Sequence, residues 1–284
     1  MKRKYTHPRE YIALWLMRAS MAVVLGSLFI ILGTVVVKGL PALNIQMITQ
    51  TPRGGYYLGK EGGILNAITG SLALAGGATC VSLIIGLPIT LYLQVFNRNQ
   101  RLAQIVRLSL DVLWGVPSIV YGAFGFTLLL WIGLRASLLG GILTLALVEL
   151  PIMVRGMEEV VKMTPCELKE ASYAVGATRL ETALRVVLRQ TAPGLITAIL
   201  LAFGRGMGDA ASVIFTAGYT DRMPTALLRP VASLPLAVFF QLGSPLPAVR
   251  ERAYAAALIL LILVLTTSCI ARIVSRRLSR HIIH

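Results

Sequence analysis

Residues 164–194 read TPCELKEASYAVGATRLETALRVVLRQTAPG, a charged stretch in a chain that is otherwise mostly apolar. The stretch predicts two short helices joined at Gly176, because glycine readily adopts the left-handed conformation that ends a helix. Each predicted helix begins with a capping signature, a threonine followed three residues later by a glutamate. These pairs are Thr164 with Glu167 and Thr178 with Glu181. The pattern is typical either of a helical loop at a membrane surface or of a docking element for another protein.

Composition places the chain in a membrane. Hydrophobic residues make up 56% of its 284 residues, and the mean hydropathy is +0.76. The net charge is +15, but the basic residues lie beside apolar segments and form no basic stripe with interleaved aromatic residues. This argues against nucleic acid as a partner. Cys80, Cys166 and Cys269 show neither metal-binding nor disulfide spacing. The first expected partner is therefore the lipid bilayer.

The apolar segments predict an all-α polytopic membrane protein with six transmembrane helices. The expected spans cover residues 19–37, 62–97, 112–134, 137–154, 191–217 and 253–271. Segment 62–97 exceeds the roughly 20 residues of one perpendicular crossing, so it has to tilt, kink or begin with an interfacial segment. The apolar run Ser233–Phe240 is too short to cross, and we expect it at the interface or as a re-entrant segment.

The spans divide the chain into four parts. Residues 1–18 form an N-terminal segment, 19–61 the first helix and an outer loop, 62–275 a core of five helices, and 276–284 a basic tail. Six spans put both termini on one side, and that side carries most of the lysine and arginine. By the positive-inside rule it is the cytoplasm. The charged loop within the core, residues 155–190, is therefore predicted to be cytoplasmic.

The fifth predicted span contains two ionisable residues, Arg205 and Asp209, four positions apart and hence on one helical face. Such residues are costly in a bilayer and are usually paired or line a polar path. One interpretation is an ion pair that holds helices together. The other is an anion path that includes Ser212, in which Arg205 donates to phosphate or carboxylate oxygens and Asp209 accepts from a protonated oxyanion.

Other charged residues leave further alternatives open. Glu149 and Arg155 bracket Pro151 in the fourth span, and Arg155 is predicted either to join the substrate path or to anchor the helix at the interface. Gly206-Met-Gly208-Asp209 also fits the Gly-x-Gly-Asp signature of intramembrane aspartyl proteases, with Asp111 as the second acid. A passive anion channel is a third possibility. We predict no metal and no cofactor, since the sequence lacks a Gly-x-x-x-x-Gly-Lys phosphate loop that would bind ATP.

The charged stretch resembles the EAA loop of bacterial ABC-importer permeases. That pattern has Glu-Ala-Ala, three residues, Gly, nine residues, and Ile-x-Leu-Pro. Glu170, Ala171 and Ser172 stand for the triplet and Gly176 for the glycine, while Arg189 replaces the expected proline and Pro193 follows one turn later. The resemblance implies the type I importer permease architecture and assigns these four residues to coupling with an ATPase.

Further residues resemble permeases of phosphate ABC importers, the PstA type. They are the segments 115–122 and 150–159, the stretch 205–210 and the run 215–218. This family often has Gly-Glu-Thr where Gly208-Asp209-Ala210 stands here. The resemblance implies phosphate import by alternating access in a bacterial inner membrane. The implied partners are a PstC-type permease, two copies of an ATP-binding subunit and an extracytoplasmic phosphate-binding protein. Another oxyanion, such as sulfate or molybdate, stays open as the substrate.

Overall fold

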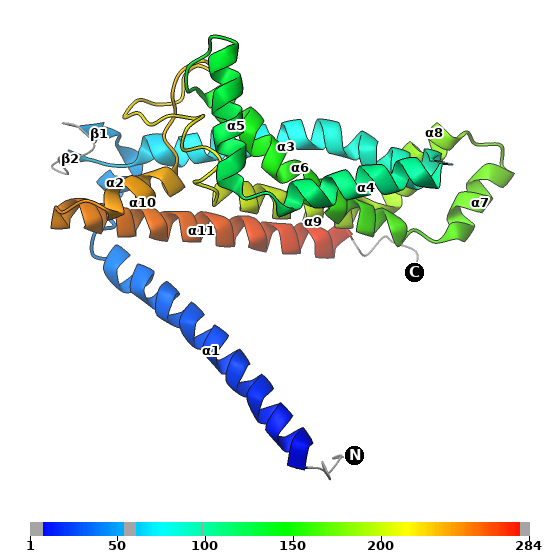
Figure 1. The fold of residues 1–284 in the computed structure, drawn as a ribbon, viewed down its shortest axis with the longest axis horizontal. Helices are drawn as coiled ribbons and strands as arrows, with labels where there is room; N and C mark the ends of the chain where they lie inside the picture. The colour runs from blue at the N-terminus through cyan, green and yellow to red at the C-terminus, as the bar shows by residue number, and fades with distance from the viewer. Residues whose placement is uncertain (1–7, 54–60, 98, 279–284) are drawn as a thin grey trace.

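The structure is a computed structural model that describes residues 8–53, 61–97 and 99–278, and the chain is mainly helical there (Figure 1). The long helices are α1 (Pro8–Gly39), α3 (Leu65–Leu91), α6 (Leu138–Lys162), α9 (Leu188–Met207) and α11 (Pro247–Leu278). The shorter ones are α2 (Ile45–Thr49), α4 (Gln100–Gly115), α5 (Ser118–Trp131), α7 (Cys166–Ala174), α8 (Arg179–Glu181) and α10 (Leu234–Leu242). Two π-helices are η1 (Tyr92–Phe96) and η2 (Thr182–Val187). Strand β1 (Pro52–Arg53) pairs antiparallel with β2 (Glu61–Gly62).

Five helical segments in the described part of the chain are long and apolar enough to cross a membrane. They are Arg9–Gly39, Leu65–Phe96, Leu138–Lys162, Arg179–Met207 and Pro247–Arg277. The consecutive helices α4 and α5 make a sixth span if they are counted as one broken span. The predicted fold, an all-α membrane protein with six spans, is confirmed on that count.

The interior forms where α3, α6 and α9 meet, and small residues let these helices approach closely. Ala78 on α3 and Ala202 on α9 are fully buried. A Cβ atom on Gly77 of α3 would lie only 2.5 Å from the side chain of Ile142 on α6. Lipid tails are as apolar as leucine, so packing of this kind, rather than escape from water, holds membrane helices together.

The predicted third span is broken at Gly115 to Pro117, residues that interrupt its helix potential in the sequence. Residues 112–134 are divided between α4 and α5, which are bent by 99° at a short break. The break lies at Val116 and Pro117, where the residue before a proline is driven out of the helical conformation and Val116 is extended, with φ −74° and ψ 129°. The hydroxyl of Tyr121 donates to the carbonyl oxygen of Leu113 at 2.7 Å, which satisfies a backbone group at the break.

The predicted bounds of the fifth span, residues 191–217, are wrong. Helix α9 begins at Leu188, directly after η2, and ends at Met207 rather than continuing to residue 217. The segment after it folds as turns and is tied to neighbouring segments by backbone hydrogen bonds. The Ser137 amide donates to the Thr216 carbonyl at 2.8 Å, and the Val231 amide donates to the Ala217 carbonyl at 3.0 Å.

The apolar run Ser233–Phe240 lies inside the bundle as most of α10. The Ser233 hydroxyl caps this helix by accepting from the Leu236 amide at 3.4 Å, and Leu234 and Leu236 are fully buried. The Leu234 amide donates to the Ser71 hydroxyl of α3 at 2.7 Å. The segment is thus held against α3 by a contact that its length alone did not predict.

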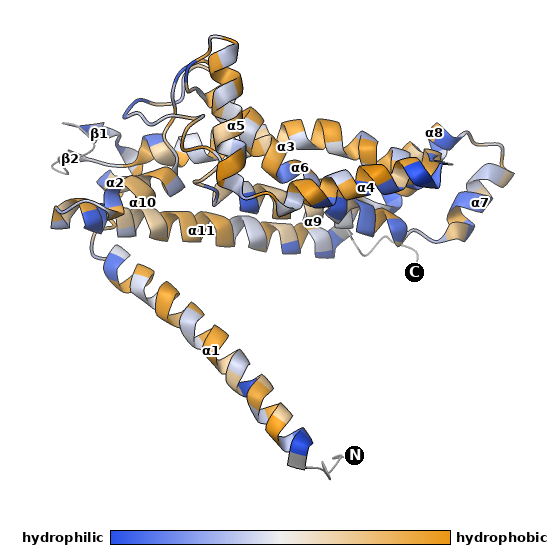
Figure 2. Ribbon diagram, in the orientation of Figure 1, coloured by the Kyte–Doolittle hydropathy of each residue, from blue (hydrophilic) through white to orange (hydrophobic). Residues whose placement is uncertain are grey.

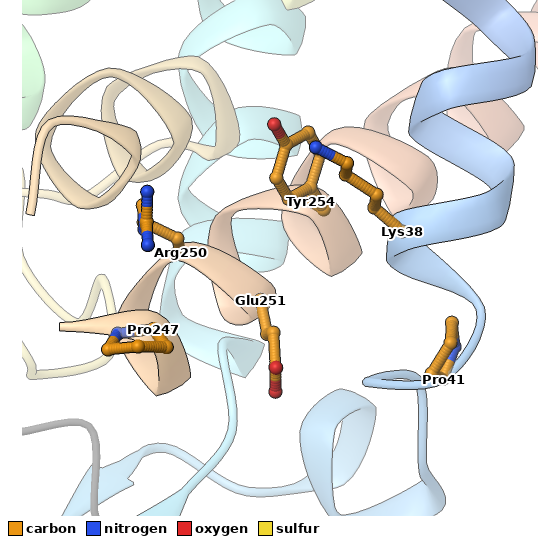
Figure 3. A pocket seen from close by; sticks show the side chains of 6 residues that line it. All are labelled: Lys38, Pro41, Pro247, Arg250, Glu251 and Tyr254. Atoms are coloured by element: carbon orange, nitrogen blue, oxygen red, sulfur yellow. The ribbon is translucent and has the colours of Figure 1, made fainter.

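Helix α1 leaves the bundle at an angle and is largely apolar along its length (Figures 1 and 2). It meets α11 at its C-terminal end, where a Cβ atom on Gly39 would lie 2.7 Å from the Tyr254 carbonyl oxygen. The Lys38 ammonium group lies 5.0 Å from the centre of the Tyr254 ring. A pocket of about 360 Å³ opens at this joint, and Figure 3 shows Arg250 and Glu251 of α11 at its edge.

Candidate functional site

An ion pair stands where α9 ends. One guanidinium nitrogen of Arg205, Nη1, lies 3.0 Å from Oδ2 of Asp209. The Arg205 side chain is 47% exposed, whereas that of Asp209 is 2% exposed. Arg205 lies in the last turn of α9, where a cation interacts favourably with the negative end of the helix dipole. The arginine therefore presents free surface to a ligand while the aspartate anchors it from behind.

Asp209 also begins the turns that follow α9. Its Oδ1 atom accepts from the Ser212 amide at 2.9 Å, as an N-capping aspartate does. The Ser212 hydroxyl is buried and has no hydrogen-bond partner in the described part of the chain. Aspartate is among the side chains that best accept from the amide three residues later, whereas glutamate is not. This gives a physical reason for aspartate where the resembling family often has glutamate.

Glu149 of α6 joins this group, and sequence reasoning did not place it there. It is fully buried, and its Oε2 atom accepts from the Thr79 hydroxyl at 2.9 Å. Its Oε1 atom has no partner among the described residues and lies against Gly206, where a Cβ atom would stand 1.9 Å from it. An ionisable residue inside an apolar span is itself a sign of function. Only the fold shows that Glu149 lies next to α9.

We call Arg205, Asp209, Ser212 and Glu149 the α9 cluster. It holds two buried polar atoms without partners, the Ser212 hydroxyl and Glu149 Oε1, beside one half-exposed cation. Leaving a buried polar atom unpaired costs about 1–3 kcal/mol, so a polar ligand that supplied the missing hydrogen bonds would be stabilised there. The cation sets the preferred ligand charge as negative. No group of three metal-ligating side chains occurs in the described part of the chain.

Arg155 has its contacts elsewhere. Its guanidinium group binds Asp111 of α4 through Nε, at 2.9 Å, and through Nη2. Its Nη1 atom lies 3.2 Å from Oε2 of Glu158. Arg155 therefore belongs to a second charged group between α4 and α6, and not to the α9 cluster.

We name residues 164–187, the main part of the charged stretch, the docking element after the role that its resemblance to the EAA loop implies. Helix α7 ends in a Schellman motif, since the Gly176 amide donates to the Tyr173 carbonyl at 3.0 Å and the Ala177 amide donates to the Ser172 carbonyl at 3.2 Å. Gly176 has φ +85°, a left-handed conformation as predicted. The turn therefore requires a residue that tolerates positive φ.

One of the two predicted capping boxes forms. The Thr178 hydroxyl accepts from the Glu181 amide at 3.2 Å, and Glu181 Oε2 accepts from the Thr178 amide at 2.9 Å. The prediction for Thr164 is wrong, because α7 begins at Cys166 without a side-chain cap and the Thr164 hydroxyl is buried without a partner in the described residues. The predicted second short helix is also longer than expected, since α8 and η2 run on into α9.

The docking element offers an uncovered surface. Met163 just before it, Val175 and Leu180 are exposed by 81%, 85% and 57% although they are apolar. A pocket of about 360 Å³ lies between α7 and η2, and its lining includes Ser172, Val175 and Arg185. The Ser172 hydroxyl lies 2.9 Å from the Thr182 hydroxyl. Glu170 and Ala171 are exposed on α7. Apolar side chains left uncovered beside a hollow are typical of a protein-binding surface.

Comparison with known families gives one clear match. The family described as binding-protein-dependent transport system inner membrane component matches residues 80–280. The phosphate transport system permease protein PstA of Yersinia pestis is 32% identical over 273 residues, which cover 96% of this chain and 92% of that protein. The protein of the same name from Haemophilus influenzae is 32% identical over 244 residues, covering 86% and 85%.

Solved structures share the fold. A chain of a bacterial alginate ABC transporter, in complex with an alginate-bound periplasmic protein, aligns over 97% of both chains with a TM-score of 0.64 at 16% identity. A chain of the inward-facing MetNI methionine ABC transporter covers 75% of this chain and 95% of its own length, with a TM-score of 0.64 at 20% identity. The family match and the relatives confirm the predicted resemblance to ABC-importer permeases, and these structures share the fold.

Proposed function

This chain belongs to the inner-membrane components of binding-protein-dependent transport systems, and from that premise we propose that its substrate is inorganic phosphate. Family membership makes it a multi-pass inner-membrane permease subunit of an ABC importer, a transport component rather than an enzyme. Relatives that are 32% identical over most of their length carry the name phosphate transport permease, which supports phosphate as the substrate class.

The α9 cluster is the observation that carries the substrate proposal. Arg205 offers a planar fork of donors for two oxygens of one anion. Asp209 already neutralises part of that charge, which disfavours a fully deprotonated anion more than one that keeps an acid hydrogen. Phosphate keeps one near neutral pH and sulfate does not. The Ser212 hydroxyl and Glu149 Oε1 are buried here, so they would reach the anion only when alternating access opened the cluster.

The docking element supports coupling to a separate ATPase. Its exposed apolar side chains and its hollow are suited to contact with another protein. We assign Glu170, Ala171, Ser172 and Gly176 to this contact. ATP hydrolysis then takes place in the partner, and no cofactor is assigned to this chain.

The assembly that we propose contains this chain, a PstC-type permease, two ATP-binding subunits and an extracytoplasmic phosphate-binding protein. Helix α1 begins and α11 ends toward the same end of the molecule as α7 (Figure 1), which supports cytoplasmic termini on the side of the ATPase. The apolar length of α1, which projects away from the bundle, gives a second membrane subunit a surface to contact (Figure 2). Alternating access would then expose the α9 cluster to one side at a time.

Reconstituted transport tests this proposal. The complete complex in proteoliposomes, with the binding protein outside and ATP on the ATPase side, should accumulate radiolabelled phosphate only when ATP is present. A tenfold excess of sulfate or molybdate should leave that uptake unchanged. Uptake of sulfate or molybdate in place of phosphate would contradict the substrate, and flux without ATP would indicate a channel.

A further inference from the structure

A second fully buried glutamate, Glu158, lies on α6, and its surroundings differ from those of Glu149. Its Oε1 atom accepts from Arg107 Nε at 2.6 Å and from Gln94 Nε2 at 2.9 Å. Its Oε2 atom accepts from Arg155 Nη1 at 3.2 Å. A buried carboxylate is tolerated when charged donors surround it, and removing its charge leaves those cations without their shared partner.

The donors come from separate elements. Gln94 belongs to η1 at the end of the second span, Arg107 belongs to α4, and Arg155 belongs to α6 itself. Arg155 also binds Asp111 of α4 and donates from Nη2 to the Arg107 carbonyl at 3.3 Å. Glu158 therefore fastens α4, the first half of the bent pair, to α6 and to η1.

The same network extends to the docking element. Arg179, the first residue of α8, donates from Nη1 to the Phe96 carbonyl at 3.3 Å. Phe96 is the last residue of η1, two positions after Gln94. The docking element is thus hydrogen-bonded to η1, and Gln94 of η1 is hydrogen-bonded to Glu158. Single π-helical turns of this kind are frequent at functional sites.

We infer that Glu158 is a positioning residue through which motion of the docking element moves α4 relative to α6. The inference rests on the proposed coupling to an ATPase. The element that moves is the α4–α5 pair, whose 99° bend at Val116 and Pro117 allows α4 to swing without unfolding either helix. Glu158 couples the position of α4 to that of η1 because it accepts hydrogen bonds from residues of both. A purely structural role would also hold α4 in place, but it would not transmit motion to α4.

Substitution of neighbouring glutamates separates transmission from bracing. In the complete complex with its ATPase, Glu158→Gln should assemble and hydrolyse ATP, while the number of anions moved per ATP falls by a factor within the roughly 2-fold to 30-fold range of single-residue coupling effects. Glu159→Gln is the matched control. Glu159 is the next residue on α6, is 68% exposed and pairs with Lys162 at 2.6 Å. Lys162 lies 4.0 Å from Glu158 Oε1, at the limit of an ion pair, so the ratio should stay close to the wild-type value.

A second variant covers failure of the first to assemble. Asp111 is 53% exposed and lies at the outer edge of the network. Asp111→Asn should therefore assemble and lower the ratio in the same direction by a smaller factor. An unchanged ratio in the variants that assemble, or an equal fall with Glu159→Gln, would overturn the inference.

A distance measurement tests the motion without any substrate. Spin labels at Ser109→Cys on α4 and Leu147→Cys on α6, with the three native cysteines replaced by serine, should report a distance change on adding ATP to the complex. That change should be absent in Glu158→Gln. No change in the wild-type network would overturn the inference. Failure of phosphate uptake alone would overturn only the proposed substrate.

Discussion

The α9 cluster and the docking element are incomplete in opposite ways. The first buries polar atoms without giving them partners, namely the Ser212 hydroxyl and Glu149 Oε1. The second leaves apolar side chains uncovered at the charged end of the molecule, with Val175 exposed by 85%. A buried polar atom is satisfied by a polar ligand, and an exposed apolar surface is satisfied by a protein. The two regions therefore point to two different kinds of partner.

Removal of the cation should have the largest effect on the α9 cluster. Arg205→Ala should reduce anion uptake by roughly 30-fold or more, since losing one member of a partly buried charge pair costs about 2 kcal/mol or more. Uptake in proteoliposomes measures this. The double variant Arg205→Ala/Asp209→Asn removes the stranded carboxylate and should assemble normally, still without uptake. Normal uptake by a well-assembled Arg205→Ala complex would show that the cluster is structural.

A change of backbone preference at Gly176 tests the docking element. A Cβ atom there meets nothing within 4 Å, so only the positive φ restricts the residue. Gly176→Val should uncouple ATP hydrolysis from uptake, because a β-branched residue disfavours this conformation by roughly 1–2 kcal/mol. Gly176→Asn is the control, since asparagine tolerates positive φ, and it should keep most of the coupling. Equal coupling in Gly176→Val and Gly176→Asn would show that the positive φ at residue 176 is not needed for coupling.

Close packing in the α9 cluster predicts a smaller effect. Gly206→Ala places a methyl group against Glu149 Oε1 and should destabilise the protein by about 1–3 kcal/mol, as overpacking does. Thermal unfolding in detergent measures the loss. Gly204→Ala meets nothing within 4 Å and should be close to neutral. Glu149→Ala in the Gly206→Ala background should restore part of the stability, and no restoration would refute the contact.

The smallest effect distinguishes the two capping signatures. Thr178→Ala should cost about 1 kcal/mol of local stability, because it removes a formed N-cap. Thr164→Ala should cost less, since the Thr164 hydroxyl has no partner in the described residues. Hydrogen exchange of the amides at residues 164–187 measures both. A larger loss for Thr164→Ala would reverse the assignment of the caps.

Periodicity and capping residues predicted the local features that depend on a few adjacent positions. Gly176 has positive φ as expected, and the Thr178 capping box forms. The same reasoning failed at Thr164, where a capping signature is present but the helix begins two residues later. It also failed in extent at residues 191–217, since an apolar composition continues after the helix has ended at Met207. Hydropathy measures tolerance of lipid, whereas a helix ends where other groups take over its backbone hydrogen bonds.

The sequence by itself determined that this protein has several apolar segments long enough to span a membrane, separated by charged segments, because hydropathy and charge are properties of each segment alone. It also identified Arg205 and Asp209 as partners from their spacing of four residues, although Asp209 lies beyond the end of α9 and the two do not share a helical face. Only the tertiary structure decided that Glu149 belongs with them and that Arg155 does not. Those contacts depend on how α6 meets α9 and α4. The hydrophobic periodicity of one helix does not specify how it packs against helices that are distant in sequence.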